Sequence, residues 1–159
     1  TFVVVLPFKI AEKEKVVQPE AATGEASIRG LHLLLAEDNE LNAEIAETVL
    51  EETGIKVKHV EDGIQCIEEL KKMPEKYYDV ILMDIRMPVM DGLAATRCIR
   101  ESDHSDSKTV PIVAMTANVF EEDVKKSFDA GMNAHLSKPV DIKQMYAVLD
   151  ELITGDGLL

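Results

Sequence analysis

Five side chains of this sequence have the types and spacing that metal and phosphoryl chemistry require. Each lies at or just beyond the end of a short apolar run, and they are Glu37, Asp38, Asp84, Thr116 and Lys138. Carboxylates gathered in one pocket repel one another and raise each other's pKa, so a cation must offset them. Carboxylate oxygens, a backbone carbonyl and retained waters are the ligands that Mg²⁺ prefers. We therefore expect a divalent-metal site.

Lys138 and Thr116 complete the groups needed to handle a phosphoryl group. A metal and an ammonium neutralise phosphoryl oxygens, and a carboxylate can act as nucleophile. From its position alone, Lys138 is explained equally well as a solvated surface charge. The other chemistry open to these residues is that of a phosphatase working through an aspartyl-phosphate. Such an enzyme is expected to have a second Asp as general acid two residues after the nucleophile, where this chain has Arg86.

The elements that must position these side chains alternate between apolar runs and amphipathic stretches. The short runs predict strands, which are Leu31–Ala36, Lys56–Val60, Asp79–Asp84, Pro111–Thr116 and Ala134–Ser137. Five strand–helix units in strict alternation predict an α/β fold, an open parallel sheet with helices on both faces. Sites in such sheets form beyond the carboxyl ends of the strands, which is where the five side chains lie.

Apolar residues at helical spacing predict a helix after each strand. The first helix follows Asn39, a suitable N-cap, repeats Leu41, Ile45 and Val49, and ends at Gly54. The other helices are predicted from residues that share this spacing: Ile64, Ile67 and Leu70; Cys98 and Ile99 after Asp91-Gly92; Phe120, Val124 and Phe128 before Gly131; and Ile142, Met145, Tyr146, Leu149, Leu152 and Ile153.

The composition restricts the class of protein. The 159 residues suffice for one domain, and 46 % hydrophobic with 30 % charged residues is typical of a globular chain. A net charge of −13 repels a phosphate backbone, so we expect no direct binding of nucleic acid. No apolar run approaches the roughly 20 residues of a membrane-spanning helix. Two cysteines, Cys66 and Cys98, make no disulfide framework, which favours reduced thiols and a cytoplasmic location.

Four segments in this order and spacing resemble the receiver domain of two-component phosphorelay proteins. They are LLLAEDNELN, LMDIRMPVMDG, IVAMTAN and HLSKP, and the resemblance covers Leu31–Ile153. The resemblance implies a flavodoxin-like (βα)5 fold whose parallel strands have the order 2-1-3-4-5. It also implies that the receiver catalyses its own phosphorylation and dephosphorylation, so that it relays or switches a two-component signal.

The same resemblance assigns roles to the acidic residues. Asp84 is expected to accept a phosphoryl group from a phosphohistidine in a Mg²⁺-dependent reaction, with Mn²⁺ as an alternative metal. Asp38 is expected to bind the metal directly and Glu37 to act mainly through water. The backbone carbonyl of Arg86 is expected to complete the metal site.

The remaining roles concern the switch and the lifetime of the phosphate. Thr116 matches the family's switch hydroxyl, and Lys138 matches its invariant cation, which also favours a cis bond to the following proline. Receivers often carry Tyr or Phe three residues before this lysine, whereas this chain has His135, equally interpretable as a switch side chain or as an ordinary strand residue. Arg86 and Asn118 flank the pocket and are candidates to tune water access, although plain loop polarity is the simpler interpretation.

The start of the chain carries a second resemblance. Thr1–Phe8 (TFVVVLPF) is similar to the closing strand of the ATP-binding domain of sensor histidine kinases; the alternative is a stray strand. We therefore expect the C-terminal part of a hybrid histidine kinase. Its parts would be a kinase remnant over residues 1–10, a linker over 11–30, the receiver over 31–154 and a tail over 155–159.

The resemblance also implies a partner that carries a histidine. This partner is a kinase dimerisation domain or a histidine phosphotransfer protein, and we expect it to dock on the first helix at Leu41 and Ala43. The parent protein is expected to be a histidine kinase, with a membrane anchor upstream of this fragment as one arrangement. A phosphorylation-independent receiver-like interaction module is the alternative function, against which the complete set of acidic, hydroxyl and ammonium groups argues.

Overall fold

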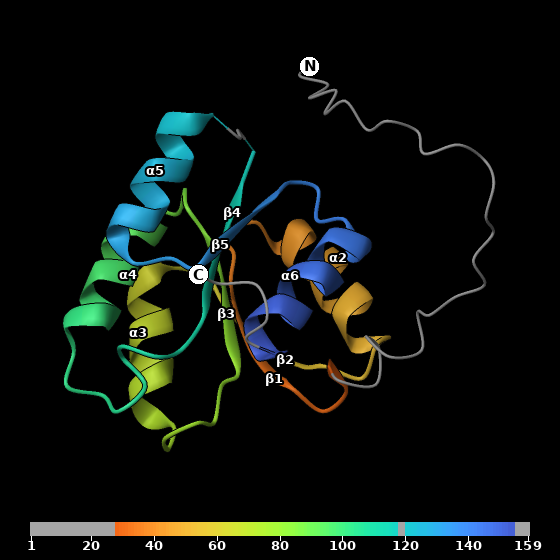
Figure 1. The fold of residues 1–159 in the computed structure, drawn as a ribbon, viewed down its shortest axis with the longest axis horizontal. Helices are drawn as coiled ribbons and strands as arrows, with labels where there is room; N and C mark the ends of the chain where they lie inside the picture. Colours follow the sequence, from red (N-terminus) through yellow and green to blue (C-terminus); the bar gives the residue numbers. More distant parts are fainter. Residues whose placement is uncertain (1–27, 118–119, 155–159) are drawn as a thin grey trace.

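A five-stranded parallel sheet forms the centre of the molecule (Figure 1). The computed structural model describes residues 28–117 and 120–154. The strands stand in the order β2-β1-β3-β4-β5. They are β1 (His32–Ala36), β2 (Lys56–Val60), β3 (Val80–Asp84), β4 (Ile112–Thr116) and β5 (Ala134–Ser137). The predicted fold and strand order are therefore confirmed, with strand ends within one residue of the prediction.

Helices cover both faces of the sheet. They are α2 (Glu40–Glu51), α3 (Gly63–Lys72), α4 (Gly92–Glu101), α5 (Glu121–Ala130) and α6 (Ile142–Thr154). Figure 1 shows α2 and α6 on one side of the sheet and α3, α4 and α5 on the other. This arrangement is the two-sided cover that a parallel sheet of apolar strands needs.

The core consists of two layers separated by the sheet. All five residues of β3 are buried, and its side chains alternate between the layers. Ile81 and Met83 pack on the side of α3 and α4, whereas Val80 and Leu82 pack on the side of α2 and α6. A central strand must therefore be apolar along its length, which is why the sequence shows continuous apolar runs here.

Local capping sets the start of three helices. The side chains of Asn39, Asp62 and Asp91 each accept a hydrogen bond from a backbone N–H three residues later. Such bonds satisfy N–H groups that the first helical turn leaves without an intrahelical partner. At the other end of α5, Gly131 adopts a left-handed conformation with φ of 108° and ends the helix.

Two of the predicted apolar stripes face solvent. On α2, Leu41 is 64 % exposed and Ile45 55 % exposed, and the buried residues of this helix are Ala43, Ala46 and Leu50. At α5, the N-cap residue Phe120 and the helical residue Phe128 are also exposed. Both helices exist as predicted, but other residues form their buried faces: Ala43, Ala46 and Leu50 on α2, and Ser127 and Ala130 on α5.

The amino-terminal boundary of the described region lies at the rim where β1 begins. Ile28 is fully buried against the α2 and α6 layer, and the Gly30 N–H donates to the Gly54 carbonyl at 2.8 Å. The predicted strand Thr1–Phe8, most of the predicted linker, Asn118 and the tail over 155–159 lie outside the described residues. Within residues 28–117 and 120–154, no helix has both the length and the apolar character needed to cross a bilayer.

Candidate functional site

Three carboxylates meet at the carboxyl ends of β1 and β3. Glu37, Asp38 and Asp84 each offer an oxygen, and these oxygens all lie within 4.8 Å of one another. Glu37 and Asp84 are buried, whereas Asp38 is exposed. The structure thus brings together the three acidic residues that the strand-end rule singled out.

Lys138 points into the same cleft from the end of β5. Its Nζ lies 2.7 Å from Oε2 of Glu37 and 2.9 Å from Oδ2 of Asp84. Its backbone N–H donates to the carbonyl of Thr116 at 2.8 Å, and its peptide bond to Pro139 is cis. Of the two interpretations open from the sequence, the structure therefore favours the pocket cation over the solvated surface charge.

The charges in the cleft shift the proton affinities of its groups. Burial raises the pKa of Asp84 to about 6; the Lys138 ammonium opposes this shift, and the charge of Glu37 adds to it. Burial alone would lower the pKa of Lys138, but its bonds to the two carboxylates outweigh burial and raise it. At neutral pH Asp84 is mostly ionised, which a nucleophilic carboxylate requires.

The loop after β3 is fixed to the Asp84 carboxylate and to the neighbouring strand. The Arg86 N–H donates to Oδ1 of Asp84 at 3.2 Å, and the Arg86 side chain is exposed. The Ile85 N–H donates to the Met115 carbonyl, and the Gly92 N–H donates to the Ile85 carbonyl. Oδ1 of Asp84 therefore has a backbone partner while Oδ2 faces Lys138.

The predicted switch residues lie on β4 and β5. Thr116 is half-buried at the end of β4, in register with Ser137. His135 is half-buried on β5 in register with Ala114, and its ring meets the ring of Phe128 edge-on at 6.2 Å. Burial lowers the pKa of His135. The ring thus lies at the contact between β5 and α5.

The donor set fits a hard divalent cation. All three acidic side chains offer oxygen, which suits Mg²⁺ and Mn²⁺ better than softer metals. Three carboxylates facing one ammonium leave an excess of negative charge that Lys138 alone does not balance. The exposure of Asp38 leaves room for the waters that Mg²⁺ retains in proteins.

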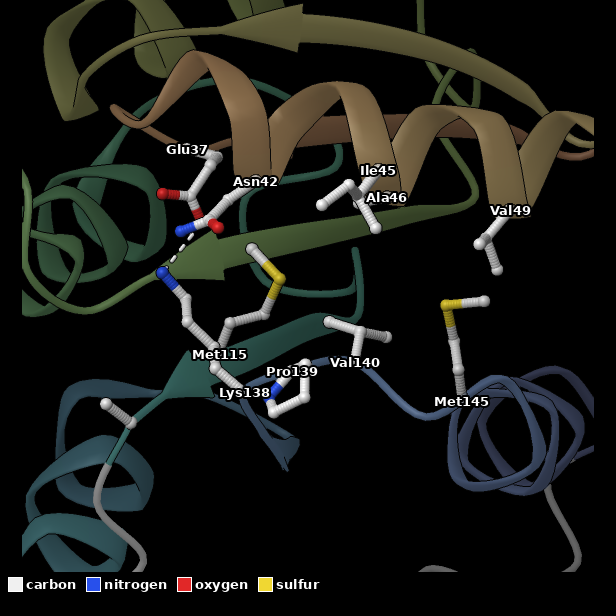
Figure 2. Close-up of a pocket in the computed structure, with 11 residues that line it drawn as sticks. Glu37, Asn42, Ile45, Ala46, Val49, Met115, Lys138, Pro139, Val140 and Met145 are labelled. Carbon is white, nitrogen blue, oxygen red and sulfur yellow. Dashed lines mark ion pairs between the residues drawn. The ribbon is translucent and has the colours of Figure 1, made fainter. Parts of the chain in front are cut away.

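An apolar groove opens beside the cleft, between α2 and the segment that leads into α6 (Figure 2). Its volume is about 430 Å³, and Glu37, Asn42 and Lys138 lie at one end of it. Ile45 and Met145 line its apolar part. Sequence reasoning missed this groove. The one available signal for Asn42 as a lining residue was its place in the first turn of α2, three residues after the N-cap Asn39 and next to the acidic pair.

Comparisons with known proteins agree with this geometry. Residues 33–150 match the response regulator receiver domain family. The chain is 38 % identical over 125 residues to the peroxide stress-activated histidine kinase mak1 of Schizosaccharomyces pombe. This match covers 78 % of the chain but only 8 % of that kinase.

Two solved structures extend the comparison. The receiver domain of sensor histidine kinase PA1611 from Pseudomonas aeruginosa, which holds a magnesium ion in its active-site cleft, is 39 % identical with a TM-score of 0.70. That match covers 79 % of this chain and 98 % of that one. The second structure is the receiver domain of Ssk1 from Saccharomyces cerevisiae, crystallised with the histidine phosphotransfer protein Ypd1. It is 26 % identical with a TM-score of 0.70, and the match covers 83 % of this chain and 94 % of that one.

Proposed function

The chain belongs to the response regulator receiver domain family, and from this membership we propose that Asp84 accepts a phosphoryl group from a phosphohistidine in a Mg²⁺-dependent reaction. The observation that carries the proposal is the single cleft in which Lys138 Nζ lies 2.9 Å from Asp84 Oδ2, beside Glu37 and Asp38. This cleft lies at the carboxyl ends of the strands. It combines the proposed nucleophile Asp84, the ammonium group of Lys138 and the carboxylates that could hold a metal.

The reaction transfers one phosphoryl group between two proteins. An oxygen of Asp84 forms a bond to phosphorus while the bond from phosphorus to the histidine nitrogen breaks, and the imidazole leaves with that electron pair. Lys138 neutralises charge on the transferred group, and the Thr116 hydroxyl is drawn to one of its oxygens. The product is an acyl phosphate that adds about one and a half to two negative charges, by analogy with other phosphorylated side chains.

The metal in this proposal is held by the residues that line the rim. Asp38 and Asp84, two of the three clustered carboxylates, would hold it with side-chain oxygens. The backbone carbonyl of Arg86 would complete the site, and Glu37 would act mainly through water. When bound, Mg²⁺ supplies positive charge that neutralises phosphoryl oxygens. Mn²⁺ offers the same hard-ligand chemistry and is expected to substitute for it.

The switch would act through the end of β4. Movement of Thr116 toward the phosphoryl group carries the following loop with it and biases a pre-existing equilibrium at the face formed by α5, β5 and α6. The ring of His135, on β5, meets the exposed ring of Phe128 on α5, so a change of its rotamer would alter that face. Arg86, whose backbone N–H bonds the Asp84 carboxylate, is proposed to tune water access and therefore the lifetime of the phosphate. From its sequence position alone, two residues after Thr116, Asn118 is proposed to share this role.

Intact-mass measurement tests the proposed acceptor. Wild-type protein incubated with Mg²⁺ and a small phosphoryl donor is expected to gain one phosphoryl group, and Asp84→Asn is expected to gain none. Asp91→Asn is the matched control, because Asn keeps the N-cap of α4 and the side chain caps a helix rather than joining the cleft.

Other outcomes would assign a different function. Wild-type protein that binds Mg²⁺ yet takes no phosphoryl group from any donor would be an interaction module rather than a phosphoacceptor. Repeated turnover of a phosphate ester, instead of a stop near one equivalent, would indicate a phosphatase.

The partner is proposed to be a helix bundle that carries the donor histidine and docks on α2. The sequence-based expectation that Ala43 contacts it is wrong, because Ala43 is only 1 % exposed and packs in the core. Leu41 and Ile45 are exposed on the same helix, and Ile45 borders the groove next to Lys138. Leu41 therefore stays a proposed apolar contact, and Ile45 replaces Ala43.

A charge substitution on α2 tests this docking surface. Ile45→Glu is expected to slow transfer from a phosphorylated histidine phosphotransfer protein by about tenfold or more, because a charge would be buried in an apolar contact. Uptake from a small donor should be unchanged. Ile153→Glu on α6 is the matched control, since Ile153 is also partly exposed but does not line the groove. Equal transfer rates for both variants would argue against docking at α2.

The parent protein is proposed to be a hybrid histidine kinase. The support is the kinase relative mak1, of which this chain matches a small part, and the resemblance of Thr1–Phe8 to a closing kinase strand. In this organisation residues 1–10 end the kinase core, 11–30 form the linker, 31–154 form the receiver and 155–159 the tail. A longer clone that phosphorylates itself on histidine and passes the group to Asp84 would support it.

A further inference from the structure

His59 on the edge strand β2 holds the backbone that carries the acidic pair. Its Nε2 lies 2.7 Å from the carbonyl oxygen of Glu37. A carbonyl oxygen only accepts, so Nε2 is the donor in this contact. Two residues of β2 bond the backbone of Glu37. His59 donates to its carbonyl from a side chain, and the backbone carbonyl of Val60 accepts from its N–H at 3.0 Å.

The end of the sheet explains why a side chain is used here. In a parallel ladder, the N–H of Glu37 pairs with Val60 and its carbonyl would pair with the N–H of Asp62. The strand β2 ends at Val60, and Asp62 serves instead as the N-cap of α3. The imidazole of His59 donates to the Glu37 carbonyl at the position where the regular ladder stops.

This bond fixes the peptide group that joins Glu37 to Asp38. The Glu37 carboxylate has further partners, since it accepts from the Asn39 N–H at 3.2 Å and pairs with Lys138 at 2.7 Å. Asp38 is exposed, so its direction depends on the backbone that carries it rather than on burial. A peptide plane free to rotate would let the Asp38 carboxylate leave the cleft.

We propose that His59 is a positioning residue for the metal site, acting by donating to the Glu37 carbonyl and so holding Asp38 toward Asp84. The inference rests on the proposed Mg²⁺-dependent function. It concerns the hydrogen bond itself, which either the neutral Nε2–H form or the cation of His59 can make. Groups that orient metal ligands without touching the metal commonly change affinity by about 10- to 100-fold when removed.

Calorimetric titration with Mg²⁺ alone tests the inference. His59→Leu removes the donor, and His59→Asn is polar but too short to reach, so both are expected to weaken Mg²⁺ binding by about tenfold. His59→Gln places an amide N–H at the same bond count from Cβ and is expected to stay within about twofold of wild type. His32→Leu, at the opposite end of β1, is the matched control and should bind as wild type does.

Uptake from a small phosphoryl donor gives a second readout. In His59→Leu the Mg²⁺ concentration for half-maximal uptake should rise about tenfold, while uptake at saturating Mg²⁺ should approach the wild-type rate, because the nucleophile and Lys138 are intact. Loss of uptake at every Mg²⁺ concentration would indicate general damage to the fold and would overturn a positioning role.

The outcomes separate this inference from the proposed function. If wild type binds Mg²⁺ and His59→Leu binds it equally well, the positioning role is overturned and the proposed function stands. If His59→Gln is as weak as His59→Leu, the hydrogen bond is not what matters, and the role is again overturned. If wild type itself shows no saturable Mg²⁺ binding, the proposed function and this inference fall together.

Discussion

Asp84 is a buried carboxylate, and burial disfavours its ionised form. Its pKa is raised to about 6, first by burial and then by Glu37, with Lys138 opposing. The folded chain therefore binds this proton more tightly than the unfolded chain, where an Asp has a pKa near 4. By linkage, the stability that comes from the raised pKa is present below about pH 4 and is lost as the pH rises through about 6. At neutral pH the ionised Asp84 lowers stability.

Replacing this charge should stabilise the protein. In Mg²⁺-free buffer, Asp84→Asn is expected to raise the free energy of unfolding at pH 7.5 by about 2 kcal/mol and to change it little near pH 4. Urea unfolding at both pH values measures this difference. Asp91→Asn should show no such pH-dependent gain, and a loss of stability in Asp84→Asn at pH 7.5 would contradict the assignment.

The sequence was sufficient to locate the acidic residues but not all of their partners. Glu37, Asp38 and Asp84 could be predicted because parallel strands end at one rim, whatever their order. From its position alone Lys138 was ambiguous, because the position of a long, flexible side chain in the sequence does not determine which groups its ammonium reaches; the family resemblance supplied its role. The role of His59 depends on where β2 stops relative to β1, and strand register is set by packing between segments far apart in the sequence.

At the level of elements, the presence of each helix was easier to predict than the face that it turns toward the sheet. Apolar periodicity correctly placed helices at α2 and α5, yet Ile45 and Phe128 face solvent. On α2 the face that meets the sheet carries Ala43, Ala46 and Leu50, so Leu41 and Ile45 remain on the solvent side. The spacing of apolar residues identifies an apolar face of a helix. Which face packs on the sheet depends on the angle at which the helix enters.

The start of α4 offers a sharp test of packing. A Cβ added at Gly92 would lie 2.3 Å from the backbone oxygen of Asp84, closer than real atoms approach. Gly92→Ala is therefore expected to lower the free energy of unfolding by about 3 kcal/mol or more and to weaken Mg²⁺ binding, because the backbone of Asp84 must move. Chemical denaturation and metal titration measure the two effects.

Gly30→Ala is the control for this prediction. Gly30 has a φ of 81°, but an added Cβ would meet no atom within 4 Å. The free energy of unfolding of Gly30→Ala should fall by only about 1 kcal/mol, because Ala disfavours the left-handed backbone, and this variant should bind Mg²⁺ as wild type does. Equal losses for the two variants would show that contact with Asp84 is not the limiting factor at Gly92.

At the scale of the whole molecule, the cleft and the two core layers share the same strands. A ligand that binds only the folded cleft must therefore stabilise the whole domain. Mg²⁺ at about 100 times its dissociation constant is expected to add about 2.7 kcal/mol to the free energy of unfolding. Asp38→Asn should lose most of this gain, which urea unfolding with and without Mg²⁺ measures. An equal gain in both proteins would place the ion elsewhere.

The net charge of −13 makes a separate prediction about salt. Raising NaCl from about 0.01 M to about 0.15 M shortens the Debye length from about 30 Å to about 8 Å and screens repulsion among the acidic groups. The thermal midpoint in Mg²⁺-free buffer should therefore rise. A matched measurement at the isoelectric pH should show a smaller rise, and a falling midpoint at neutral pH would mean that attractive pairs dominate.

The core packing of Ile28 and the backbone hydrogen bond of Gly30 have a consequence for how the domain can be tethered. Both lie where β1 begins, whereas every reacting group lies where the strands end. A linker attached before β1 therefore leaves the entrance of the cleft unobstructed. Lengthening it with glycine and serine would then alter the effective concentration at which a covalently linked donor meets its acceptor, and so the frequency of encounters, without altering the bond-making step.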